Sequence, residues 1–166
     1  VLHIDKVKKT VTVQAGCHLG KDPFDPTERA TLQNSLLYQL EQAGLAIPDL
    51  GGITHQTVGG FLSTGSSGGS TIYSFEDQLL SVTFINCGKN GPEKVTFSRP
   101  VSENLDDPFY GVGVATIGLF GIMIEATFQC VDSFLITGTE SIAKAVDIKN
   151  LPECKFDPFW KSDSVD

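Results

Sequence analysis

The sequence predicts an α+β domain, built as a mainly antiparallel sheet flanked by helices. Short segments with alternating apolar side chains are joined by tight turns, which is typical of antiparallel strands. One longer segment carries apolar residues at helical spacing instead. A chain of 166 residues fits one domain and is long enough to bury a core.

The first strand is expected at residues 10–15, where apolar and polar side chains alternate. Val11, Val13 and Ala15 point to one side of it, and Gly16 ends it. The segment Val1–Ile4 is expected to pair with this strand through a turn at residues 5–9.

A helix is expected next, from about Thr27 to Ala43. Asp25 can cap it, Pro26 suits a first helical position, and Glu28 stands where a capping box places an acid. Apolar residues then recur at helical spacing, at Leu32, Leu36, Leu37, Leu40 and Ala43, and Gly44 follows as a stop signal.

The remaining elements are expected after a long glycine-rich segment. We expect strands at Leu79–Ile85, Lys94–Phe97, Ile122–Cys130 and Phe134–Thr137, and a short helix at Pro108–Ala115. The turn between the first two of these strands is Gly88-Lys89-Asn90-Gly91. In the third, one face should carry Ile122, Ile124, Ala126 and Phe128.

Composition argues against several classes of function. The net charge is −8, with 20 acidic and 12 basic residues, and no basic cluster is present, so nucleic acid is not an expected partner. No apolar stretch approaches the roughly 20 residues of a membrane-spanning helix. Because the sequence begins with Val1 rather than Met, its N-terminus does not indicate the cellular compartment of the protein.

Cysteine and histidine spacing indicates no metal site. The four cysteines lie far apart, without a CxxC pair, so neither a zinc site nor a disulfide framework is expected, and a reducing compartment is favoured. Cys87 and Cys130 are interpreted as small core residues. His18 has no third ligand within sequence reach, and His55 either contacts a cofactor or shapes its loop.

The segment from Pro48 to Ser70 differs from its surroundings. It holds seven glycines and several hydroxyl residues in 23 positions, without a sustained period, so we expect an irregular loop with a function. Glycines let the backbone approach a ligand, and hydroxyls add donors, which suits a pyrophosphate. The lysine of a nucleoside-triphosphate loop and the Rossmann arrangement are both missing. From the residues alone, nucleotide binding and a merely flexible loop remain alternatives.

Three sequence motifs, in order, resemble the vanillyl-alcohol-oxidase (PCMH-type) family of FAD-binding flavoproteins. The run Gln56–Gly69, with its T-V-G-G core, resembles that family's central FAD-binding segment. Thr12–Gly16 resembles the strand that opens the second FAD subdomain, and Gly118–Thr127 resembles the later G-x-x-G-I segment. The chain is most similar in appearance to the sugar-lactone oxidases of the arabinono- and gulonolactone types.

The resemblance implies FAD as the cofactor and the second FAD subdomain as the fold. It places the backbone of Val58, Gly59 and Gly60 against the pyrophosphate or ribityl chain, and backbone groups of Ile122 and Ile124 near the adenine. Gln56 and Thr57 would bind through their side chains. The cradle would continue toward the flavin through Ser63, Thr64, Gly65, Ser67 and Gly68.

The expected function is an FAD-dependent oxidoreductase, an oxidase or a dehydrogenase. It would oxidise an alcohol carbon of a small molecule, plausibly a sugar lactone, by hydride transfer to the flavin. The alternatives are a non-catalytic nucleotide-binding fragment and an FAD subunit of a larger assembly. No catalytic residue is identified, no metal is expected, and the oligomeric state is open.

We expect the chain to be a middle portion of a longer protein. Residues 1–140 would form the FAD-binding subdomain, and residues 141–166 would begin a following region. The family's first FAD subdomain and its substrate domain are not recognised in this sequence. The lactone-oxidase pattern T-G-x-H-G is here Thr64-Gly65-Ser66-Ser67-Gly68, without the histidine.

Overall fold

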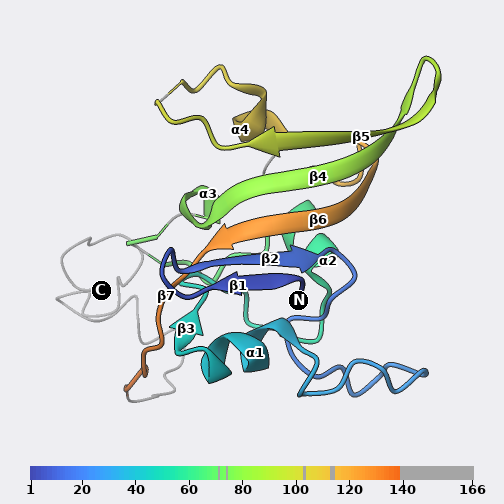
Figure 1. The fold of residues 1–166 in the computed structure, drawn as a ribbon. Coiled ribbons are helices and arrows are strands. Elements are labelled where there is room, and N and C mark those ends of the chain that lie inside the picture. The colour runs from blue at the N-terminus through green and yellow to red at the C-terminus, as the bar shows by residue number, and fades with distance from the viewer. Residues whose placement is uncertain (71, 74, 103, 113–114, 139–166) are drawn as a thin grey trace, which may run out of the picture. The chain divides into compact units, whose positions relative to one another are not determined.

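The fold is described from a computed structural model, shown in Figure 1. The described residues are 1–70, 72–73, 75–102, 104–112 and 115–138. The chain divides into two units, Val1–Ser133 and Phe134–Asp166, and every helix and strand below belongs to the first. The predicted boundary at residue 140 and the region 141–166 lie outside the described residues.

Five antiparallel strands form the main sheet, in the order β1-β2-β6-β4-β5. Their bounds are β1 His3–Asp5, β2 Thr10–Gln14, β4 Leu79–Gly88, β5 Gly91–Ser98 and β6 Ile122–Gln129. The beginning and the end of this part of the chain thus meet in the sheet, where β6 lies between β2 and β4 (Figure 1). The predicted fold class is confirmed.

The strand patterns of the sequence translate directly into burial. Val11 and Val13 on β2 are completely buried, while Thr10 and Thr12 are half-buried. β1 pairs with β2 as expected, with Ile4 opposite Val11. The β4–β5 hairpin turns at the predicted glycines, and Gly91 has a φ of +112°, a conformation that L side chains rarely adopt.

Strand β6 has the predicted position, but its expected apolar face is only partly buried. Ala126 and Phe128 are buried, whereas Ile122 is 73% exposed. The β4–β6 register shifts at two places, between Leu79 and Ser81 and again between Thr83 and Phe84. Such irregularities interrupt strict alternation along a strand pair, and Ile122 also lies at the outer start of its strand.

Four short helices and a two-stranded ribbon complete the unit. They are α1 Leu36–Gln42, α2 Val58–Ser63, α3 Phe75–Gln78, α4 Pro108–Val112, β3 Leu45–Ala46 and β7 Val131–Asp132. Helix α2 packs against β2 and β6, and α1 packs against β3. The main core forms where these layers meet, around Phe61 of α2 and Phe128 of β6, whose rings lie 6.4 Å apart.

The predicted helix from Thr27 to Ala43 is wrong in its first half, since α1 begins only at Leu36. Asp25 does act as a cap, but of a compact turn. Its carboxylate accepts backbone N–H bonds from Thr27, Arg29 and Ala30 at 2.8–2.9 Å. Glu28 has a φ of +54°, which is incompatible with a helix.

Three smaller expectations also need correction. Residues 134–137 form no strand; β7 lies just before them and pairs with β3. Cys87 is exposed, because it lies near the turn end of β4, whereas Cys130 is buried as predicted. No helix in the described part of the chain is long and apolar enough to cross a membrane.

Candidate functional site

The candidate site is built where the glycine-rich segment runs beside the chain that leaves β2. Backbone hydrogen bonds connect Leu19 N–H to Gln56 O at 2.9 Å and Val58 N–H to Cys17 O at 2.8 Å. His18 and Thr57 form an antiparallel bridge between them. The T-V-G-G motif is therefore attached to the end of β2 before its helix begins.

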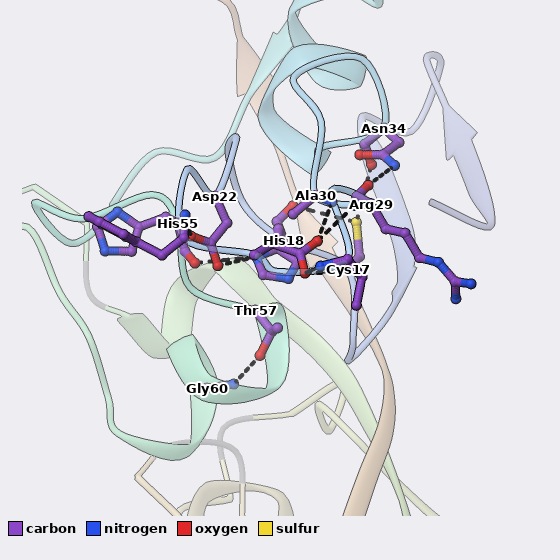
Figure 2. A network of polar contacts seen from close by, with 12 residues as sticks. Cys17, His18, Asp22, Arg29, Ala30, Asn34, His55, Thr57 and Gly60 are labelled. Atoms are coloured by element: carbon purple, nitrogen blue, oxygen red, sulfur yellow. Dashed lines mark hydrogen bonds and ion pairs between the residues drawn. The ribbon is translucent and has the colours of Figure 1, made fainter.

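Residues 58–63 form helix α2 within the segment predicted to be irregular, so that prediction is wrong here. Thr57 caps the helix, because its hydroxyl oxygen accepts the N–H of Gly60 at 3.2 Å (Figure 2). Val58, Phe61 and Leu62 are fully buried and lie at helical spacing. Burial of this face stabilises a helix whose two glycines disfavour it.

The amides of the T-V-G-G core are already occupied. Val58 N–H donates to Cys17 O and Gly59 N–H to Ala15 O, both at 2.8 Å, and Gly60 N–H donates to the cap. These three donors are therefore not free for a phosphate in this structure. Gly59 serves close packing, since a Cβ there would lie 3.2 Å from Ala15 O.

Ala15 brings two of the three sequence motifs together. Its N–H donates to Ile124 O of β6 at 2.9 Å, and its carbonyl accepts the N–H of Gly59. The predicted positions on α2 and β6, more than 60 residues apart in sequence, are thus joined through one residue of the first motif. Ile122 lies two residues further out on β6 and is exposed.

The hydroxyl residues after α2 form a connected polar surface. Thr64 Oγ1 donates to Gly60 O at 2.9 Å and lies 3.0 Å from Ser66 Oγ. Ser66 Oγ in turn donates to Gln56 Oε1 at 3.3 Å. Gln56, Thr64 and Ser66 therefore lie side by side, although they are separated by up to ten positions in the sequence.

The turn at Ser67–Gly69 surrounds a carboxylate that the sequence analysis missed. Asp49 is 3% exposed; its Oδ2 accepts the Ser67 hydroxyl at 2.7 Å, and its Oδ1 accepts the Gly68 N–H at 2.8 Å. Gln78 fixes the backbone of Asp49, donating from Nε2 to its carbonyl at 2.9 Å and accepting its N–H at 3.1 Å. No local sequence signal connects residues 49, 67 and 78.

A hollow of about 470 Å³ lies beside this polar surface. The residues that line it come from the segments just before and just after α2 in the sequence. They are Gly51, Gly52, Ile53, His55, Gln56, Ser66 and Ser67. A larger hollow, of about 690 Å³, lies over the 21–33 turn, where no predicted site residue is found. We place the candidate site at the smaller one, because two predicted residues, Gln56 and Ser67, line it.

The segment that follows α4 lies against the end of α2. Ala115 N–H donates to Leu62 O and Ile117 N–H to Ser63 O, both at 3.0 Å. Ala115 and Ile117 have φ values of +54° and +49°, which are strained for residues with side chains. Between them, the hydroxyl of Thr116 is buried and has no partner within the described residues. Strain and an unused buried donor are typical of a ligand-binding segment.

His18 and His55 both make contacts within this arrangement. The Nδ1 of His18 lies 3.2 Å from the carbonyl of His55 and 3.8 Å from Oδ2 of Asp22 (Figure 2). The ring of His55 packs edge-on against Phe24, with centroids 5.9 Å apart. Within the described ranges, no group of three His, Cys, Asp or Glu side chains is placed to hold a metal ion.

Comparison with known proteins finds an FAD-binding family model and enzymes named for sugar lactones. A family model described as an FAD binding domain matches residues 28–91. D-arabinono-1,4-lactone oxidase of Candida glabrata is 30% identical over 159 residues, which is 95% of this chain and 26% of that protein. The mitochondrial L-galactono-1,4-lactone dehydrogenase 2 of Oryza sativa subsp. japonica is 27% identical over 150 residues, 90% of this chain and 22% of that protein. The chain thus spans about a quarter of the length of these relatives.

Solved structures share the fold at lower sequence identity. An alkyldihydroxyacetonephosphate synthase superposes with a TM-score of 0.55 at 21% identity, over 80% of this chain and 21% of that one. Cholesterol oxidase from Brevibacterium sterolicum gives a TM-score of 0.53 at 18% identity, over 74% and 21%. These likenesses concern the fold alone.

Proposed function

We propose, from the premise that the chain belongs to the PCMH-type (vanillyl-alcohol-oxidase) family of FAD-binding flavoproteins, that its parent protein is an FAD-dependent oxidoreductase. Its substrate would be a small molecule with an oxidisable alcohol carbon. The observation that carries this proposal is the agreement between the family match and the folded motifs. The match over residues 28–91 includes the T-V-G-G core, which is bonded to β2 and through Ala15 to β6.

We propose a sugar lactone as the substrate class. Both curated relatives described above are named for a 1,4-lactone substrate. The absence of histidine from the Thr64–Gly68 run is the main departure from the lactone-oxidase pattern. This departure bears on the substrate class, and the cofactor proposal rests on the family match instead.

The residues proposed to hold FAD are those predicted from the sequence: Gln56, Thr57, Val58, Gly59, Gly60, Ser63, Thr64, Gly65, Ser67, Gly68, Ile122 and Ile124. We propose different roles for different members of this set. Val58 and Gly59 use their amides to fix α2, so they would act by shaping the site. Gln56 lines the hollow and would supply a polar contact, and Thr64 is connected to it through the Ser66 hydroxyl.

The fit of a cofactor is supported by Thr116. A buried hydroxyl without a partner is unfavourable by about 1–3 kcal/mol, unless a ligand or water satisfies it. Thr116 lies beside the end of α2, next to Ser63, so we add it to the proposed binding residues. When bound, the flavin supplies the chemistry by accepting a hydride, and this chain binds and orients it.

The test is the visible spectrum of the full-length parent protein. We expect bound flavin after gel filtration, and loss of its absorption when D-arabinono- or L-galactono-1,4-lactone is added without oxygen. Flavin that is retained but not reduced by any alcohol or lactone would favour the non-catalytic alternative. Additional chains that co-purify would favour an FAD subunit of a larger assembly. A colourless full-length protein that does not take up FAD would refute the proposal.

A further inference from the structure

The Asp49 carboxylate is buried in an unusual environment. Transfer of a charged group from water into a protein interior is costly unless hydrogen bonds or an opposite charge compensate it. Among the described residues, Asp49 forms no ion pair. Its compensation comes instead from the Ser67 hydroxyl and the Gly68 N–H, at 2.7 and 2.8 Å. Hydrogen bonds to an ionised acceptor are about twice as strong as neutral ones.

The aspartate is itself held rigidly from the sheet side. The amide side chain of Gln78 is 1% exposed and bonds both the N–H and the carbonyl of Asp49. Gln78 immediately precedes β4. A polar connection therefore runs from the start of β4, through Asp49, to the Ser67–Gly69 turn.

The turn is closed tightly around this carboxylate. A Cβ at Gly68 would lie 2.3 Å from Leu50 O and 2.8 Å from Asp49 Oδ1, closer than any side chain tolerates. Gly69 N–H adds a bond to Ser67 Oγ at 3.1 Å, and its φ is +77°. Glycine at both positions is thus required for the turn to wrap around the aspartate.

We infer that Asp49 is a positioning residue for the proposed FAD site, acting as an internal anion that fixes the Ser67–Gly69 turn. The carboxylate occupies the donors that an anionic ligand would otherwise use in a glycine- and hydroxyl-rich turn. Ser67 and Gly68 would then serve the cofactor by holding the Ser63–Gly69 segment in one conformation, rather than by contacting a phosphate. This inference rests on the proposed function for the identity of the ligand.

Two substitutions at residue 49 separate positioning from direct contact. In Asp49→Asn, the amide oxygen can still accept the Gly68 N–H, and its NH₂ group can donate to Ser67 Oγ. The turn is therefore retained and the negative charge is removed. Asp49→Ala removes both bonds. Asp25→Ala is the matched control, since Asp25 holds an exposed turn in the same manner outside the site.

The measurements are the Kd for FAD and hydrogen exchange of the 64–70 segment, both on the full-length parent protein. We expect Asp49→Ala to weaken FAD binding by about tenfold or more and to speed exchange of the Gly68 amide. Asp49→Asn should bind FAD as tightly as the wild type or more tightly, with exchange unchanged. The Asp25→Ala control should match the wild type in both measurements.

Each outcome bears on the inference. Equal FAD affinity of Asp49→Ala and the wild type would overturn it, and so would an equal loss in Asp49→Asn, which would indicate that the charge itself contacts the ligand. If Asp49→Ala does not fold, Ser67→Ala removes the hydroxyl bonds to Asp49 and Gly69, keeps the Gly68 bond to Asp49, and should weaken FAD binding severalfold. A wild-type protein that binds no FAD refutes the proposed function. Slow exchange of the Gly68 amide that depends on Asp49 would then still support the inference that Asp49 fixes the Ser67–Gly69 turn.

Discussion

The two adjacent glycines of the T-V-G-G motif give a test of why glycine is needed there. Alanine is favoured over glycine in a helix by about 1 kcal/mol, and this gain applies to both positions of α2. At Gly60 the new Cβ would lie 3.4 Å from Thr57 Oγ1, an ordinary contact. At Gly59 it would lie 3.2 Å from the carbonyl oxygen of Ala15 and 3.3 Å from its Cβ.

The backbone of Ala15 has little freedom to move away, because its N–H is bonded to β6 and its carbonyl to α2. Overpacking of a fixed site costs about 1–3 kcal/mol. We therefore expect Gly60→Ala to stabilise α2 slightly and Gly59→Ala to destabilise it, with about 1–3 kcal/mol between the two variants.

The difference is measured as the free energy of local opening of α2, from hydrogen exchange of peptides that cover Val58–Ser63 in the full-length protein. Equal protection of the two variants would refute the packing argument. FAD binding adds a second readout. If Gly60 is glycine because the cofactor approaches its backbone, Gly60→Ala should weaken FAD binding although the helix becomes more stable.

Four further predictions concern parts of the fold outside the Ser67–Gly69 turn. A thiol reagent should label exposed Cys87 rapidly and spare Cys130, since burial raises the pKa of the Cys130 thiol to about 11; rapid labelling of both in the folded protein would contradict this. Because the pKa of the Cys130 thiol is raised in the folded state, its contribution to stability is complete below pH 9.0 and is lost as the pH rises toward about 11. In the Cys130→Ala variant, the free energy of unfolding measured in urea should therefore fall less over this pH range. The Thr27 hydroxyl and neighbouring backbone N–H groups lower the pKa of Asp25, so the turn that it holds should persist below pH 3.8 and open only at lower pH; an NMR titration with an ordinary midpoint would refute this. Phe61→Ala should cost about 3–5 kcal/mol, whereas a loss below 1 kcal/mol would mean that α2 is not docked on β6 as described.

The sheet could be predicted from the sequence because its information is local. The alternation of Val11 and Val13 and the glycines of the β4–β5 turn act within a few residues. Strand order could not be predicted in this way, since β6 lies between β2 and β4 and its pairing involves residues more than 100 positions apart.

The helices were harder to predict, for two opposite physical reasons. The segment after Asp25 has helical spacing, but the carboxylate satisfies its amides in a turn, and Glu28 adopts a left-handed conformation. Helix α2 has poor helix formers, yet the Thr57 cap and burial of Phe61 stabilise it. In the first place a local side-chain cap overrides the apolar spacing, and in the second the tertiary packing of Phe61 overrides low helix propensity.

The candidate site could be located from composition, but the hydrogen bonds within it could not be predicted. Glycine and hydroxyl residues mark a turn that can approach a ligand, and the described hollow lies there. The sequence does not indicate which donors are already used. Asp49 and Gln78 act through tertiary contacts 18 to 29 residues along the chain, so their roles became visible only in the fold.

The central position of β6 has a consequence for synthesis on the ribosome. Strand β2 is complete at Gln14, but its partner ends at Gln129, about 115 residues later. At 5–20 residues per second, β2 waits on the order of 10 s with one backbone edge unpaired. The β1–β2 hairpin is thus exposed to wrong pairing with other nascent chains during that interval. Slower translation before residue 122 would lengthen this exposure and lower the yield of folded protein.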